Sequence, residues 1–139
     1  DALDWRIPET HSIYWAHLGL KRCSHNPSRE KALLHTHCHQ KALVGSAHLS
    51  SILGTAYELS EIDSGCCGMA GSFGYEKEHY DVSLQVGQRR LLPAVRNAPD
   101  AVVITPGISC RQQIQDTTGR RALHPAEALV RALNKDAGL

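Results

Sequence analysis

Two adjacent cysteines, Cys66 and Cys67, lie in a short stretch that also contains four glycines: Gly65, Gly68, Gly71 and Gly74. Adjacent cysteines pair poorly with each other, because a vicinal disulfide distorts the peptide between them. Glycine tolerates positive φ and has no side chain, so this stretch can turn tightly and approach a bulky group. We interpret it as a loop that presents two thiolates to a metal or cluster. The alternative is two buried thiols in a glycine-rich turn, since free cysteine often packs as a small hydrophobe.

The size and charge of the chain restrict its class. Its 139 residues are enough for one domain with a core, and 15 basic against 14 acidic residues argue against a general nucleic-acid binder. No apolar run is long enough to cross a bilayer, and no signal peptide is recognised. Five cysteines, an odd number, suit ligand or catalytic thiols in a reducing compartment, so we expect a cytoplasmic protein. Because the first residue is Asp1, we expect a processed chain or a piece of a longer one.

Apolar and turn patterns predict alternating strands and helices. The expected strands cover 32–34, 57–62 and 101–104. The expected helices cover 10–18, 42–53, 76–96 with an interruption at Pro93, 109–115 and 124–133. This alternation is typical of an α/β fold: a small three-layer domain with a short, mainly parallel sheet flanked by helices. We expect residues 1–30 to form a connecting segment and residues 31–139 to form the domain.

Each predicted strand is followed by cysteine: Cys38 after the first, Cys66 and Cys67 after the second, and Cys110 after the third. Because the carboxyl ends of parallel strands meet at one edge of a sheet, we expect the four thiols to lie together there. Helices beginning after Cys67 and Cys110, the latter with Ser109 as N-cap, would direct backbone N–H groups toward an anionic group at this edge.

Four thiolates suit a 4Fe–4S cluster or a tetrahedral zinc ion. The sequence has neither the paired C-x-x-C knuckles of zinc ribbons nor ferredoxin spacing. A zinc-binding structural or interaction domain therefore stays open as an alternative, with His39 and His124 as further candidate ligands. A metal-free thiol enzyme is a third interpretation, with one of the vicinal cysteines as nucleophile and His39 or His124 as base.

A separate zinc alternative uses three histidines that alternate after the first strand: His35, His37 and His39. If the strand continued through them, all three would share one face. The fifth cysteine, Cys23, lies among basic residues, and we interpret it as an incidental surface thiol.

The motifs around the four cysteines resemble the cysteine-rich "CCG" domain. These motifs are His-x-x-Cys-His at 35–39, Cys-Cys-Gly-Met-x-Gly-Ser-Phe-Gly at 66–74, and Gly-Ile-Ser-Cys at 107–110. The domain occurs in heterodisulfide reductases and in the iron–sulfur subunits of glycolate oxidase and anaerobic glycerol-3-phosphate dehydrogenase. Residues 66–80, 109–114 and 124–127 are more similar still to the C-terminal end of fused FAD-linked oxidoreductases. The resemblance covers about residues 31–133.

The resemblance implies an iron–sulfur electron-transfer domain of an FAD-linked oxidoreductase that acts on 2-hydroxy acids such as D-lactate, glycolate or 2-hydroxyglutarate. Cys38, Cys66, Cys67 and Cys110 match the family's ligand positions, and Cys23 does not. The implied partners are a flavin domain, with FAD outside this chain, and a first cysteine-rich half, so the isolated domain is not expected to be catalytic. The chain departs from the family in two ways. It carries one cysteine-rich module instead of two, and it has Gly107 at the first cysteine position of the family's last Cys-x-x-Cys motif.

Overall fold

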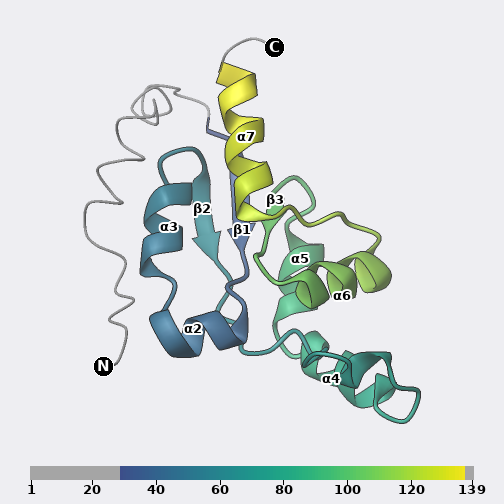
Figure 1. Cartoon of the computed structure of the whole chain (residues 1–139). Coiled ribbons are helices and arrows are strands. Elements are labelled where there is room, and N and C mark those ends of the chain that lie inside the picture. Colours follow the sequence, from purple (N-terminus) through teal and green to yellow (C-terminus); the bar gives the residue numbers. More distant parts are fainter. Residues whose placement is uncertain (1–28, 137–139) are drawn as a thin grey trace, which may run out of the picture.

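The computed structural model describes residues 29–136 (Figure 1). The predicted helix at 10–18, Cys23 and most of the expected connecting segment lie outside the described residues. The elements in chain order are β1 (Lys31–Leu34), α2 (Cys38–Val44), α3 (Ala47–Leu53), β2 (Glu58–Glu61), the 3-10 turn η2 (Phe73–Tyr75), α4 (Tyr80–Gln88), α5 (Leu91–Asn97), β3 (Val102–Ile104), α6 (Ile108–Thr118) and α7 (Pro125–Asp136).

The three strands form one parallel sheet in the order β2-β1-β3. Ala32 of the central strand pairs with Leu59 on one side and with Val102 on the other. Beyond β3, Leu123 makes a further parallel bridge with Ile104. All three strands therefore end at the same edge of the sheet, as the sequence predicted.

Side chains alternate across the sheet and form a core on each face. Ala32, Leu34 and Ile104 pack with Leu53 of α3 and Ala128 of α7. On the other face, Val103 belongs to a second core whose helical members come from α5 and α6: Leu91, Leu92, Val95, Cys110 and Ile114. The predicted α/β class with a parallel sheet between helices is thus confirmed. In the described part of the chain, no helix combines the length and apolar character that crossing a membrane requires.

The segment after β1 differs from its predicted form. The strand ends at Leu34 and a helix begins at Cys38, so the three histidines do not share one strand face, and the geometry on which that zinc alternative depended is wrong. The helix expected over 42–53 is also wrong as a single element. Gly45, with a φ of 72°, separates α2 from α3, because this left-handed conformation ends a helix.

The helical stretch expected over 76–96 is interrupted, as predicted, but the break between α4 and α5 lies at Arg89 and Arg90 and not at Pro93. Pro93 lies in the first turn of α5, where a missing N–H leaves no helical hydrogen bond unmade. The helix expected directly after Cys67 is absent, and only η2 lies between Cys67 and α4. Gly107, not Ser109, is the N-cap of α6.

Candidate metal centre

The four cysteines follow the three strand ends. Cys38 is the first residue of α2, Cys66 and Cys67 lie in the loop after β2, and Cys110 lies in the first turn of α6. Figure 1 shows α2 and α4 at the end of the sheet toward which the strand arrows point. All four thiols are free of disulfides; Cys67 and Cys110 are buried, whereas Cys38 and Cys66 are partly exposed. The site therefore has a closed inner half and a half open to solvent.

The two buried thiols lie close enough to each other for a hydrogen bond between them to change both of their pKa values. That bond lowers the pKa of Cys67 strongly, against the raising effect of burial, and a contact with His35 lowers it further. The same bond is the main reason that the pKa of Cys110 lies far above its ordinary value, and burial raises it further. The two buried thiols are therefore coupled, and their interaction shifts the two pKa values in opposite directions.

The partly exposed thiols complete the group. Burial is the main factor that raises the pKa of Cys66, while a backbone hydrogen bond opposes it: the Gly68 N–H donates to the Cys66 sulfur at 3.3 Å. The charges of Cys67 and Cys38 raise the same pKa, and Cys38 also makes a side-chain hydrogen bond with Cys66. Each of the four sulfur atoms thus interacts with at least one other.

The loop that carries the vicinal cysteines is fixed by glycines and by one buried amide. Gly68 has a φ of 102°, and a Cβ there would collide with the backbone oxygen of Ser83 in α4. The Gln113 amide of α6 donates to the backbone oxygen of Cys67 at 3.2 Å and to the hydroxyl of Ser83 at 3.1 Å. The loop is therefore held between α4 and α6, which sets the positions of its two thiols.

The residues that directly follow β1 and β3 are polar and fully buried. His35 Nδ1 lies 2.7 Å from the hydroxyl oxygen of Ser64. Neither His35 Nε2 nor Thr105 Oγ1 has a hydrogen-bond partner of ordinary geometry. Each instead lies close enough to a thiol to lower its pKa: His35 acts on Cys67, and Thr105 acts on Cys110.

The two histidines proposed as further ligands occupy other positions. His39 is exposed on α2. His124 Nδ1 accepts a hydrogen bond from the Ala126 N–H at 3.2 Å, so it caps the first turn of α7. Neither ring is among the main causes of the shifted cysteine pKa values. Sequence reasoning missed Thr105, and considered His35 only in the three-histidine alternative. A polar residue directly after a buried strand was the signal that could have found both.

The fit to a metal group rests on the kind of donors present. Within residues 29–136, no three or more His, Cys, Asp or Glu side chains already surround one metal position. The donor set is nevertheless four thiols that interact with one another, and two of them are buried. Soft thiolates are the ligands of iron–sulfur clusters and zinc, and their binding displaces thiol protons. The residues therefore fit a thiolate-bound group.

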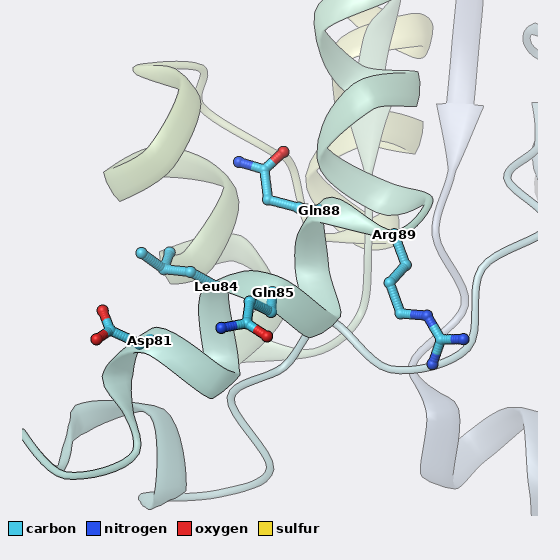
Figure 2. Close-up of a pocket in the computed structure, with 5 residues that line it drawn as sticks. All are labelled: Asp81, Leu84, Gln85, Gln88 and Arg89. Atoms are coloured by element: carbon cyan, nitrogen blue, oxygen red, sulfur yellow. The ribbon is translucent and has the colours of Figure 1, made fainter.

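A surface pocket on α4 lies apart from the cysteines. Asp81, Leu84, Gln85, Gln88 and Arg89 line it, and none of these is a thiol (Figure 2). Figure 2 shows Asp81 and Arg89 at opposite ends of the group, so their charges do not form one recognition site. This pocket therefore contains none of the thiols of the candidate metal centre.

The comparisons with known proteins point to dehydrogenases. The chain is 32% identical over 105 residues to a subunit of anaerobic glycerol-3-phosphate dehydrogenase from Escherichia coli K12, and the match covers 74% of this chain and 26% of that protein. It is 34% identical over 73 residues to D-2-hydroxyglutarate dehydrogenase of Pantoea ananatis, which covers 52% of this chain and 7% of that protein. The E. coli K12 D-2-hydroxyglutarate dehydrogenase is 33% identical over the same length.

The chain therefore spans about a quarter of the first relative and a smaller share of the others. No family profile and no solved structure matches it. The chain is related in sequence to parts of larger dehydrogenases. The predicted resemblance to oxidoreductases is confirmed as a sequence relationship to parts of dehydrogenases. The narrower assignment to the CCG domain stays a prediction.

Proposed function

We propose that Cys38, Cys66, Cys67 and Cys110 bind an iron–sulfur cluster of the 4Fe–4S type, and that the domain transfers electrons within a larger dehydrogenase. The observation that carries the proposal is the interaction of four free thiols at the carboxyl edge of the sheet. A bound cluster of this type accepts and releases single electrons. The relation to parts of dehydrogenases supports a redox role over a purely structural one.

The residues of the chain hold and shield the thiolates. Cys67 and Cys110 would bind on the buried side, where they exclude water, and Cys38 and Cys66 would bind on the side open to a redox partner. The Gly68 N–H already donates to the Cys66 sulfur, and a hydrogen bond of this kind stabilises negative charge on a thiolate ligand. The proposal places this chemistry in the cytoplasm, where thiols stay reduced.

The parent enzyme is proposed to carry FAD on a separate domain and to oxidise a 2-hydroxy acid. The D-2-hydroxyglutarate dehydrogenases among the relatives support this substrate class. A first cysteine-rich half and the flavin domain would be the partners of this chain. The surface of α2 supports such docking: it has no buried residue, and it exposes Leu43 and Val44 in the same helix as Cys38.

Serine substitutions test the ligand assignment. In anaerobically purified protein, Cys38→Ser, Cys66→Ser, Cys67→Ser and Cys110→Ser should each lose most of the visible cluster absorption, because a serine hydroxyl replaces a thiolate ligand poorly. Cys23→Ser is the matched control and should retain the wild-type spectrum. Full cluster content in all four single variants would exclude these residues as ligands. About one zinc per chain without sulfide would favour the structural zinc alternative.

A further inference from the structure

Two buried polar atoms near the cysteines have no ordinary partner: His35 Nε2 and Thr105 Oγ1. Both residues are 0% exposed, and each directly follows a strand at the carboxyl edge of the sheet. A buried polar group without a partner is costly, so such atoms in a native protein call for an explanation. The neighbouring group that each one influences is a sulfur atom, Cys67 for His35 and Cys110 for Thr105.

The environment of His35 determines which ring nitrogen carries the proton. Ser64 Oγ lies 2.7 Å from Nδ1, so the hydroxyl can donate to Nδ1 and leave the proton on Nε2. In the opposite arrangement the hydroxyl would donate to the Ile62 backbone oxygen at 3.5 Å, the limit for such a bond. That arrangement would also direct the Nε2 lone pair at the sulfur of Cys67. Both arrangements keep the 2.7 Å contact between Ser64 Oγ and His35 Nδ1. The first is favoured because it turns an N–H donor, and not a lone pair, toward the sulfur of Cys67.

The hydroxyl of Thr105 is the one polar group of that residue left without a partner. Its N–H donates to the Leu123 backbone oxygen at 2.9 Å, and its backbone oxygen accepts from the Arg111 guanidinium at 3.3 Å. The backbone is therefore fixed on both sides, and the O–H is free to rotate toward Cys110.

We propose that His35 and Thr105 are positioning residues that donate hydrogen bonds to the sulfur atoms of Cys67 and Cys110 and thereby raise the reduction potential of the bound cluster. The inference rests on the proposed cluster. Reduction adds negative charge that is spread over the sulfur atoms, and N–H and O–H donors stabilise the reduced form more than the oxidised form. The two donors come from different strand ends, so the sheet itself sets their positions.

The test is the midpoint potential of the 139-residue chain loaded with its cluster. His35→Leu and Thr105→Val remove the donors at similar volume, and each should shift the potential to a more negative value. His35→Gln and Thr105→Ser keep a donor and should recover most of the wild-type potential. His48→Gln, at an exposed position of α3, is the control and should not move it. Unchanged potentials in the Leu and Val variants, at wild-type iron content, would overturn the inference and leave the proposed function standing.

A second measurement uses the wild-type protein and does not depend on how the variants fold. Nitrogen NMR of the histidine-labelled chain, in its reduced metal-free and zinc-loaded forms, reports the tautomer of His35. We expect the proton on Nε2, with slow exchange against solvent. A proton on Nδ1 would overturn the hydrogen bond to Cys67. If the wild-type chain takes up no cluster, the proposed function fails and this tautomer alone decides whether His35 donates to the thiol.

Discussion

At the scale of single residues, the two glycines beside the vicinal cysteines have different constraints. Gly68 has a φ of 102° and closely approaches the backbone of Ser83, whereas a Cβ at Gly65 would meet nothing within 4 Å. The sequence shows two equivalent glycines, and only the backbone conformation separates them. The close approach is therefore specific to one side of the cysteine pair.

Substitution of these glycines should separate their roles. Gly68→Ala should lower the free energy of unfolding by about 2–3 kcal/mol, because the new Cβ forces both a strained φ and a backbone collision. Gly65→Ala should change it by less than about 0.5 kcal/mol. Denaturant unfolding of both variants measures the difference. Equal stabilities would mean that the loop does not pack against α4 as described.

The positions of the cysteines could be predicted from the sequence, but the side chains that surround them could not. The positions of the four cysteines after strands could be read from the sequence, because buried apolar runs and their ends leave a clear pattern. The hydrogen-bond partners that surround them could not. Gln113 binds the Cys67 backbone from 46 positions away, and no local signal distinguishes it from the exposed Gln112 beside it.

At the scale of elements, Arg120 joins α5 to the start of β3. Its guanidinium donates to the backbone oxygens of Val95 at 2.6 Å and Ala98 at 2.8 Å, and also to that of Ala101. The neighbouring Arg121 instead makes one exposed ion pair with Glu127 at 3.1 Å. Arg120 therefore connects two elements of the fold, whereas Arg121 makes a surface ion pair.

Arg120→Met should destabilise the fold by about 2 kcal/mol, because partly buried backbone oxygens lose a charged donor. Arg121→Met is the matched control, and its cost should stay below about 1 kcal/mol, as for other exposed ion pairs. Thermal and denaturant unfolding give both values. A similar cost for the two variants would contradict the anchoring role of Arg120.

The start of α7 is stabilised in a pH-dependent way by Glu127. Its pKa lies below the ordinary value of 4.5, mainly because its carboxylate accepts the His124 N–H and, to a smaller extent, because Arg121 lies beside it. A lowered carboxyl pKa adds stability that is present above the unfolded pKa and is lost as the pH falls through the folded pKa. Glu127→Gln should therefore be destabilising at neutral pH and nearly neutral in strong acid. Unfolding curves at both pH values test this, and a constant difference would contradict it.

Element boundaries were the weakest part of the sequence prediction, for physical reasons. Residues 42–53 have helical composition throughout, so propensity alone joins them into one helix, and in residues 76–96 Pro93 indicated a break at the wrong position. The first is divided by the left-handed backbone of Gly45. The second is divided where α5 turns to bury Leu91, Leu92 and Val95 against the sheet, and tertiary packing of this kind overrides local propensity.

At the scale of the whole molecule, the alternating order of strands and helices was enough to predict the architecture. Parallel strands need helical crossovers, and these place every strand end at one edge. That edge then gathers the residues that follow each strand: His35 and Cys38, the vicinal cysteines, and Thr105 with Cys110. The fold thus explains why cysteines distant in sequence interact, and their function depends on what they bind.

The most direct test of the proposed function is the iron and acid-labile sulfide content of the wild-type chain after purification without oxygen. We predict about four iron and four sulfide per chain, with a visible absorption band that is bleached by a chemical reductant. A chain that contains neither iron nor sulfide, and cannot be reconstituted with them, would contradict the proposal that these four cysteines bind a cluster.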